Sequence, residues 1–476
     1  MTENEKQLHD QAYQAVVQKG AKVQADPYRQ TYHLMPPVGL LNDPNGWVQW
    51  KGTYHMFFQW NPFSPDHTHK FWGHYTSEDL VSWNEEKIAL APSEWYEKNG
   101  CYSGSAIEKD GELALLYTGN VKDENDERES YQCLAVSSDG ISFEKKGPVV
   151  DSLPEGYTAH FRDPKVWKEN GVYYFVIGAQ TEELKGQVLL YKSADFKQWK
   201  YAGPFAGSGL NGLGDFGYMW ECPDLFSLNG RDILVVSPQG LETKGHDFEN
   251  VYQSGYFLGE ADLEAGSFSH GDFQELDQGF EFYAPQTTVD DTGRRILVGW
   301  MGVPDSDEEF QPTVQNEWVH CLTIPRMLEV KNNKVYQQPV PELKKLRGDE
   351  PLQMKVNTAF GAEVALTPAS EIEIDCEEAE ELKLSIREEI SLYYDPEKKL
   401  LQLSRPRFRD GATETRSCSV AQLSRLHIYL DHSSIEVFIN DGESVMSARF
   451  FPDPEIPTVQ ISGGEGRITW SSWELS

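Results

Sequence analysis

The chain has 476 residues, of which 39% are apolar and 12% aromatic, enough for two or three domains with large cores. Acidic residues outnumber basic ones by 76 to 42, which gives a formal net charge of −34. A surface this acidic repels phosphate backbones and anionic lipids, so the composition excludes nucleic acid and membrane surfaces as expected partners.

The amino-terminal segment MTENEKQLHDQAYQAVVQKG carries charges every few positions and lacks the apolar centre of a secretory signal. We expect residues 1–30 to form a polar helix that leads into the first domain, and we expect the protein to be cytoplasmic. No segment approaches the roughly 18 uninterrupted apolar residues of a membrane span. The six cysteines are scattered without CxxC or His-paired metal spacing, so we expect reduced thiols and no metal site.

An internal repeat organises residues 31–340. Five segments place a glycine before an apolar strand: WKGTYHMFFQW, KDGELALLYTG, ENGVYYFVIGAQ, LNGRDILVVSPQG and DTGRRILVGWMG. Their glycines are Gly52, Gly111, Gly171, Gly230 and Gly293, and the successive spacings are 59, 60, 59 and 63 residues. Each glycine suits the positive φ of a two-residue hairpin turn. An even period of several short strands predicts a five-bladed β-propeller, whereas a β-sandwich built from the same strands would not require the period.

Acidic residues recur in phase within this repeat. Asp43, Asp163 and Glu221 each precede the glycine of their own repeat by 8 or 9 residues, and Ser103 and Tyr283 hold the corresponding positions of the other two. Taken alone, the stretch LLNDPNGW is explained by a tight turn. A residue needed only for a turn would not recur at the same position of several repeats, however. The innermost strands of a propeller bring equivalent positions together at one mouth of the central channel, so we expect the three acids to meet there.

Carboxyl groups gathered in apolar surroundings cannot all ionise, so one retains a proton while another is charged. The sequence lacks a phosphate-cradling GxxxxGK[ST] loop and a GxSxG elbow. Paired carboxyl groups beside aromatic walls favour glycosyl transfer to water, in which one acid protonates the leaving oxygen and a second attacks the anomeric carbon or activates water. A non-catalytic sugar-binding propeller is an alternative of another class, but it predicts the loss of at least one acid.

The motifs NDPNG (42–46), FWGH (71–74), RDP (162–164) and WECPD (220–224) resemble the signature blocks of glycoside hydrolase family 32. The resemblance covers almost the whole chain and implies hydrolysis of β-fructofuranosides with retention, without a cofactor. CYSGSA, YTAHFRDPKVW and QGFEFYAPQT are similar to bacterial members that hydrolyse sucrose 6-phosphate. Because no residue spacing reveals a phosphate site, hydrolysis of unphosphorylated sucrose or short fructans stays open.

The resemblance also implies roles for the matching residues. Asp43 would be the nucleophile, Glu221 would protonate the leaving glucose and then deprotonate water, and Asp163 would stabilise the transition state. The residues expected to bind the sugar are Leu40, Leu41, Asn42, Gln59, Trp72, Tyr102, Ser103, Arg162, Tyr283 and Trp300. Cys222 has no base beside it in the sequence and is interpreted as a buried small residue.

A phosphate on the substrate needs cations. Candidates are His67, His69 and Lys70, in the loop before FWGH, and Lys192 in the third repeat. The acidic run DSDEEF (305–310) has some character of a calcium loop, but it lacks the EF-hand spacing and glycine. We therefore expect that run to be a solvated loop.

Beyond about residue 340 the repeat ends and polar and apolar residues alternate, most clearly in HIYLDHSSIEVFINDGESVMSARFF. This pattern predicts a β-sandwich over residues 341–476, with a hairpin turn at Asp441 and Gly442. The expected fold is therefore all-β, a five-bladed β-propeller followed by a C-terminal β-sandwich, as the family resemblance also implies. We expect the sandwich to stabilise the propeller or to support a homodimer, and a small-molecule sugar to be the ligand.

Overall fold

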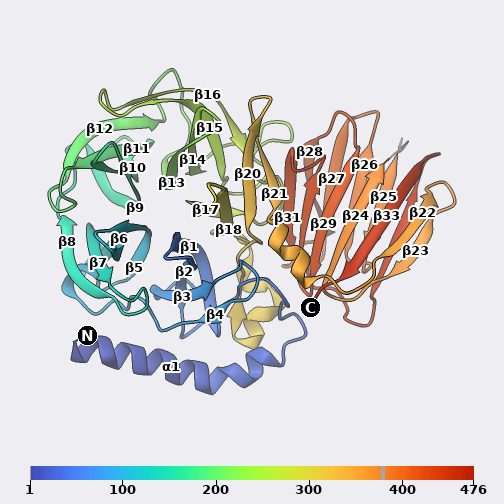
Figure 1. The fold of residues 1–476 in the computed structure, drawn as a ribbon, viewed down its shortest axis with the longest axis horizontal. Helices are drawn as coiled ribbons and strands as arrows, with labels where there is room; N and C mark the ends of the chain where they lie inside the picture. The colour runs from blue at the N-terminus through green and yellow to red at the C-terminus, as the bar shows by residue number, and fades with distance from the viewer. Residues whose placement is uncertain (1, 377–380) are drawn as a thin grey trace.

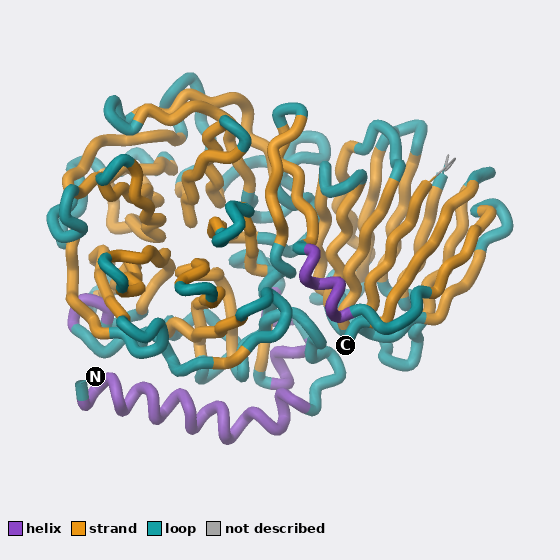
Figure 2. The backbone as a smooth tube through the Cα atoms, viewed as in Figure 1, coloured by secondary structure: helices purple, strands orange, loops and turns teal. Residues whose placement is uncertain are grey.

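The computed structural model describes residues 2–376 and 381–476. Within these ranges the strands form seven sheets, five small ones and two with six strands each. Figure 1 shows the small sheets arranged around an axis and the two large sheets stacked beside them. The tube in Figure 2 shows that strands dominate both parts and that one long helix runs along the outside of the ring. The all-β prediction of a five-bladed propeller followed by a sandwich is confirmed.

The five small sheets are called blades I to V. Blade I contains β1 (Gly39–Trp50), β2 (Thr53–Asn61), β3 (Phe71–Ser77), β4 (Asn84–Glu85) and β19 (Trp318–Val319). Blade II contains β5 (Cys101–Lys109), β6 (Glu112–Lys122), β7 (Arg128–Ser137) and β8 (Glu144–Val150). Blade III contains β9 (Tyr157–Glu169), β10 (Val172–Thr181), β11 (Gly186–Ser193) and β12 (Lys200–Gly207). Blade IV contains β13 (Met219–Leu228), β14 (Arg231–Gln239), β15 (Gly255–Asp262) and β16 (Ser267–Glu275), and blade V contains β17 (Tyr283–Val289), β18 (Arg295–Trp300), β20 (Arg326–Lys331) and β21 (Lys334–Pro339).

The repeat glycines lie in the hairpin turns, as the sequence predicts. All five have φ between 77° and 86°, and in blades I to IV the residue before the glycine also has positive φ, between 49° and 54°. Two successive residues with positive φ form the type I′ turn, whose twist matches that of the flanking strands. The 60-residue period therefore reflects one tight hairpin between the first two strands of each blade.

The innermost strand of every blade has an irregular register near the channel mouth. The irregularities lie between Leu41 and Pro44 in β1, Cys101 and Gly104 in β5, Arg162 and Lys165 in β9, Glu221 and Asp224 in β13, and Tyr283 and Gln286 in β17. Three residues within them, Asp163, Cys222 and Ala284, have positive φ. Bulges of this kind re-aim side chains that regular pleating would send to the faces of a sheet.

Apolar side chains hold neighbouring blades face to face. Ala114 and Leu116 of β6, for example, are fully buried against Phe161 of β9 and Phe175 of β10. Burying each large side chain contributes about 1.5 to 3 kcal/mol. The ring closes where β19, which lies in the connection between β18 and β20 of blade V, pairs in parallel with β1 of blade I at Gly39 and Leu40.

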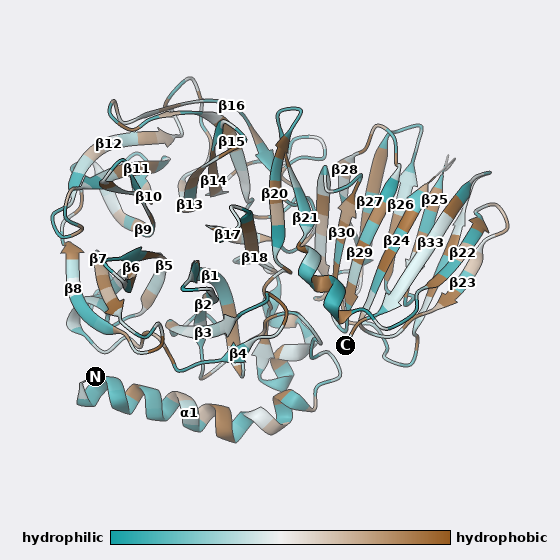
Figure 3. Cartoon of the chain, viewed as in Figure 1, coloured by the Kyte–Doolittle hydropathy of each residue, from teal (hydrophilic) through white to brown (hydrophobic). Residues whose placement is uncertain are grey.

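Helix α1 (Glu3–Gln24) lies along the outer side of the propeller and is hydrophilic over most of its length (Figure 3). The hydroxyl of Thr2 caps it by accepting from the Glu5 amide at 3.2 Å. Lys19 ties it to the ring through Glu317 at 2.7 Å, while Val23 is buried. In the part of the chain that the structure describes, no helix is long and apolar enough to cross a membrane.

The sandwich consists of two antiparallel sheets that face each other across an aliphatic core. One sheet contains, in spatial order, β22 (Leu352–Asn357), β33 (Arg467–Glu474), β24 (Ser370–Cys376), β29 (Arg425–Asp431), β30 (Ser434–Ile439) and β31 (Ser444–Arg449). The other contains β23 (Ala362–Ala365), β32 (Thr458–Gly463), β25 (Leu382–Ile386), β26 (Ile390–Asp395), β27 (Leu400–Pro406) and β28 (Thr413–Ser419). The predicted hairpin at Asp441 and Gly442 joins β30 to β31.

Propeller and sandwich are joined by a fully buried ion network centred on Arg326 of blade V. Its Nε and Nη2 donate to Glu436 Oε2 of the sandwich at 3.1 and 2.6 Å, and its Nη1 donates to Asp277 Oδ2 at 3.0 Å. The two remaining N–H groups donate to Gln337 and Ser447 at 3.0 and 2.7 Å. All five guanidinium donors are therefore satisfied, which a buried arginine requires to offset its desolvation.

We predict that Arg326→Met destabilises the protein by about 3 to 5 kcal/mol, because Asp277 would stay buried without its cation and Glu436 would lose its guanidinium partner, with its contact to His33 remaining. Urea unfolding followed by tryptophan fluorescence measures this loss. The matched control is Lys334→Gln, which breaks an exposed ion pair with Glu443 across the same two domains and should cost at most about 1 kcal/mol. Equal effects of the two substitutions would contradict the importance of the buried network.

Candidate active site

Three carboxyl groups from blades I, III and IV gather at one mouth of the propeller. Asp43 belongs to the irregular part of β1 and is half-buried. Its Oδ2 accepts from the Ser103 hydroxyl of blade II at 2.5 Å, and its Oδ1 accepts from the Asn42 side-chain amide at 3.0 Å. Burial raises the pKa of Asp43 and the charge of Glu221 adds to the increase, while the bond from Ser103 and the Lys70 ammonium act against it.

Glu221 is held by four hydrogen bonds from three side chains. Arg162 of blade III donates to Oε1 from Nε at 2.9 Å and from Nη2 at 2.7 Å. Tyr283 of blade V and Gln239 of blade IV donate to Oε2 at 2.7 and 2.9 Å. The Glu221 side chain is 14% exposed. It is thus fixed from three blades and still accessible from the channel.

Asp163 lies deepest of the three acids and has a φ of 70°, which turns its side chain away from the regular strand direction. Its amide donates to the Thr118 hydroxyl at 3.1 Å, and its Oδ2 accepts from the Cys222 amide at 3.0 Å. Burial raises the pKa of Asp163 to about 7, with the charge of Glu221 as the second cause and Arg162 opposing both. The cluster therefore holds a proton near neutral pH.

Cys222 connects two of the acids. Its sulfur lies 3.7 Å from Asp43 Oδ2 and 3.5 Å from Asp163 Oδ2, so its single S–H group can donate to either acid. The interpretation of this cysteine as a small packing residue is confirmed in part: it packs against the hydrophobic core, but it is half-buried and its thiol also faces the acids. Its pKa lies well above the usual range because the thiol is desolvated and faces carboxylates, so the thiol stays protonated.

The remaining residues predicted to bind sugar fall into two groups. Asn42, Ser103, Arg162 and Tyr283 contact the acids directly, and Tyr102 lies half-buried at the rim. The others pack behind the site with at most 2% of their surface exposed: Leu40, Leu41, Gln59, Trp72 and Trp300.

Two of the buried residues support the site without being exposed to it. The Trp72 indole donates to the Tyr102 carbonyl at 3.1 Å, and the Gln59 amide donates to the Cys101 carbonyl at 2.8 Å. Both bonds link blade I to the irregular segment of β5. These side chains therefore position the backbone that carries Ser103.

Two further residues of the site were not among those predicted from the sequence. Gln239 contacts Glu221 from the second strand of blade IV. Gln286 of blade V accepts from the Trp47 amide at 2.7 Å and donates to the Gly104 carbonyl at 3.0 Å, which links blades I, II and V. Only the in-phase position of Gln286, three residues after Tyr283, hinted at a place near the channel.

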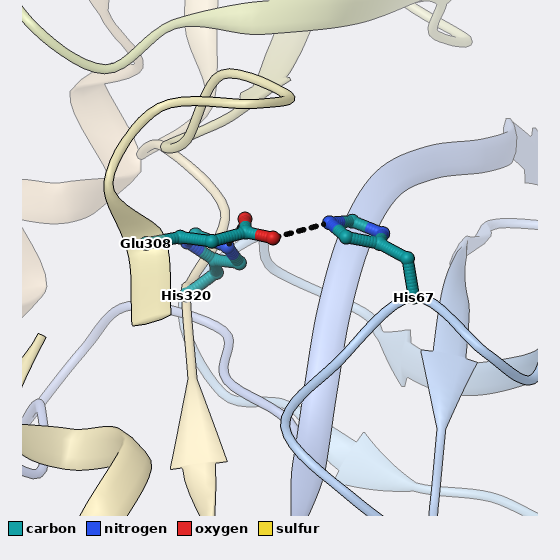
Figure 4. A group of neighbouring side chains, drawn as sticks. All are labelled: His67, Glu308 and His320. Carbon is teal, nitrogen blue, oxygen red and sulfur yellow. Dashed lines mark hydrogen bonds and ion pairs between the residues drawn. The ribbon is translucent and has the colours of Figure 1, made fainter. Parts of the chain in front are cut away.

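A chain of hydrogen bonds runs from the nucleophile candidate Asp43 to the connection between β18 and β20 of blade V. Lys70 is buried, and its ammonium donates to Asn42 Oδ1 at 2.7 Å and contacts His67 Nδ1 at 2.8 Å. His67 Nε2 lies 2.9 Å from one oxygen of Glu308, and His320 Nε2 lies 2.8 Å from the other (Figure 4). Burial lowers the pKa of Lys70 to about 8, and the nearby carboxylates keep it from falling further.

Glu308 lies in a short 3₁₀ helix, η2 (Glu308–Phe310), within the acidic run 305–310. The prediction of a solvated loop is wrong at this residue, whose side chain is only 17% exposed. Burial favours its neutral form, but the two imidazoles bond its carboxylate and lower its pKa. His67 comes from the loop between β2 and β3 of blade I, and His320 lies 12 residues beyond Glu308, so the run 305–310 alone could not reveal them.

Two imidazoles and a carboxylate this close together form a set that can hold a metal ion. The hydrogen bonds favour a different use. An ammonium group only donates, so Lys70 makes His67 Nδ1 an acceptor and leaves the proton on Nε2, directed at Glu308. His67 Nε2, the atom that would bind a metal, therefore carries a proton that it donates to Glu308. The three side chains instead hold Lys70 in place beside Asn42.

The sequence matches the N-terminal domain model of glycosyl hydrolases family 32 over residues 33–339 and the C-terminal model over residues 342–475. The chain belongs to glycoside hydrolase family 32. It is 53% identical to the sucrose-6-phosphate hydrolase of Bacillus subtilis over the full length of both chains. It is 46% identical to the enzyme of the same name from Klebsiella pneumoniae, over 97% of this chain and 96% of that one.

Solved structures of family 32 agree with this membership. A sucrose-6-phosphate hydrolase from Lactobacillus gasseri superimposes with a TM-score of 0.90 at 31% identity, covering 98% of this chain and 96% of that one. A mutant family 32 β-fructofuranosidase from Bombyx mori in complex with sucrose gives a TM-score of 0.87 at 33% identity, covering 98% and 97%. The protein is a glycoside hydrolase that acts on fructosides, as its motifs predict.

Proposed function

We propose that the protein hydrolyses the β-fructofuranosidic bond of sucrose 6-phosphate and releases glucose 6-phosphate and fructose. The observation that carries the chemistry is the meeting of Asp43, Asp163 and Glu221 at one channel mouth, each with different hydrogen-bond donors. The substrate assignment is supported by full-length relatives of that name, including one that is 53% identical.

In the first step, a carboxylate oxygen of Asp43 attacks the anomeric carbon of fructose. The electron pair of the breaking bond goes to the glucose oxygen, which takes a proton from Glu221. The product is a fructosyl ester of Asp43. Ser103 and Asn42 orient the attacking carboxylate, and such pre-organisation reduces the entropy lost on reaching the reactive geometry.

In the second step, water gives a proton to Glu221 and attacks the same carbon, and Asp43 leaves as a carboxylate. Two displacements at one carbon retain its configuration. Asp163 accepts hydrogen bonds from fructose hydroxyls, which strengthen as positive charge develops on the ring. Such bonds favour the ionised form of Asp163, while the acid role proposed for Glu221 requires the protonated form of that residue.

Hydrolysis of unphosphorylated sucrose or short fructans is the second candidate, because the same three acids support it and one structural relative is a β-fructofuranosidase in complex with sucrose. A non-catalytic sugar-binding role would be consistent with the loss of an acid, and this chain retains all three.

We predict that kcat/KM is at least about tenfold higher for sucrose 6-phosphate than for sucrose, equivalent to about 1.4 kcal/mol of transition-state discrimination. Steady-state rates with both sugars, measured on one enzyme preparation, test this directly. Equal kcat/KM values for the two sugars would contradict the assignment of the phosphorylated substrate and would be consistent with a general β-fructofuranosidase.

We also predict that kcat/KM on sucrose falls about tenfold per pH unit above about pH 7. The active form carries a proton for the leaving glucose, and the cluster loses that proton as pH rises through the pKa of Asp163, about 7. At acid pH the rate falls again as Asp43 is protonated. Sucrose is the substrate of choice because it lacks the phosphate ionisation near pH 6. A rate that stays constant up to about pH 9 would contradict the assignment.

A further inference from the structure

A second group of basic side chains lies beside Arg162, separate from the contacts that Lys70 makes with Asn42. His160 of β9 lies there because its Nδ1 is 2.9 Å from Arg162 Nη1. Arg128, the first residue of β7, lies over the Tyr102 ring with its guanidinium carbon 5.5 Å from the ring centroid. Both arginines act on His160 electrostatically. We call Tyr102, Arg128 and His160 the rim cluster.

Arg128 is held in place but its charge is not compensated. Its Nη1 donates to the buried side chain of Asn120 at 2.8 Å, and the Tyr102 ring supports its face. No carboxylate of the residues that the structure describes forms an ion pair with it, whereas the nearby Arg162 is neutralised by Glu221. On a protein of net charge −34, an oriented and unpaired guanidinium at the channel mouth is suited to an anionic ligand.

His160 offers a second donor in the same place. An arginine only donates hydrogen bonds, so Arg162 makes His160 Nδ1 an acceptor and leaves the proton on Nε2. Burial lowers the pKa of His160 to about 4, and Arg162 and Arg128 contribute, so the imidazole is neutral at pH 7. Among the described residues, none accepts a hydrogen bond from this Nε2–H, and the side chain is half-exposed at the rim.

We propose that Arg128 and the Nε2–H of His160 bind the phosphate of sucrose 6-phosphate. This inference rests on the proposed function, in which the oxygen that links fructose to glucose lies at Glu221. Two successive contacts, Glu221 to Arg162 and Arg162 to His160, lead from that oxygen outward to the rim cluster. In the bound substrate, a glucose unit that extends from Glu221 in this direction brings its 6-phosphate towards the unpaired guanidinium of Arg128. A guanidinium can bond two phosphate oxygens at once.

The cations suggested by the sequence are less suitable. Lys70 is engaged by Asn42 and His67, and the carboxylate of Glu308 beside them would repel a phosphate. Strand β10 pairs Gly178 with both Arg162 and Val188, so Lys192 lies four residues further along β11, roughly 13 Å from that level. His69 is exposed and contacts Thr68.

The test compares kcat/KM on sucrose 6-phosphate and on sucrose for the wild type, Arg128→Gln and His160→Gln. We expect Arg128→Gln to lower the value for sucrose 6-phosphate about 10- to 100-fold, the loss typical of a charge-assisted bond, while sucrose changes less than about threefold. Arg128→Lys should recover only part of the preference, because an ammonium lacks the planar fork.

The matched control is Lys122→Gln. Lys122 is the strand neighbour of Arg128 across β6 and β7 and forms an exposed ion pair with Asp126 at 2.8 Å. Its substitution removes the same unit of charge as Arg128→Gln. It should leave the substrate preference unchanged. Inorganic phosphate provides a second readout: it should inhibit the wild type competitively, and Arg128→Gln should weaken that inhibition about tenfold or more.

The outcomes separate this inference from the proposed function. A wild type without preference for sucrose 6-phosphate overturns both. A wild type with the preference, together with an Arg128→Gln variant that keeps it, overturns the rim cluster alone. A loss of preference in Lys122→Gln as large as in Arg128→Gln would mean that general surface charge, rather than the rim cluster, selects the phosphate.

Discussion

Mutual repulsion among three carboxyl groups is the constraint on which the site depends. Each acid is stabilised by donors from a different blade. Ser103 of blade II bonds Asp43, Cys222 of blade IV bonds Asp163, and Arg162 of blade III bonds Glu221. A single blade could not supply these contacts, because its side chains alternate between its own two faces. The closed ring is therefore a requirement of the chemistry as well as of the fold.

The irregular inner strands convert the repeat into a site. A regular strand at Asp163 would direct the side chain towards a neighbouring blade, whereas its φ of 70° directs it into the cluster. Such conformations cost free energy and persist only where the surroundings fix them. Here the surroundings include the parallel pairing of β19 with β1 and the buried Arg326 network that fastens blade V to the sandwich. Contacts outside the acid cluster thus maintain the geometry between the three acids.

The sequence predicts the features that recur in every blade, but it does not predict the side-chain contacts between blades. The glycine period specifies one tight hairpin per blade, of type I′ in blades I to IV, so the propeller and the phase of Asp43, Asp163 and Glu221 follow from it. The bond from Tyr283 to Glu221 was not predictable, because it depends on how two blades face each other. The burial of Glu308 was missed for a similar reason: its partner His67 comes from blade I, and its partner His320 lies 12 residues further along the connection, beyond β19. Sequence patterns record the local period, but not the register between sheets.

The measurement that tests the central claim most directly is the identity of the residue that becomes covalently attached to fructose. Glu221→Gln should still react with fructosyl fluoride, whose leaving group needs no protonation, but should hydrolyse the ester slowly because no base activates water. Mass spectrometry of the digested protein is then predicted to find one fructosyl unit on the peptide that contains Asp43. A fructosyl unit on another residue, or turnover to product of inverted configuration without any adduct, would contradict the account.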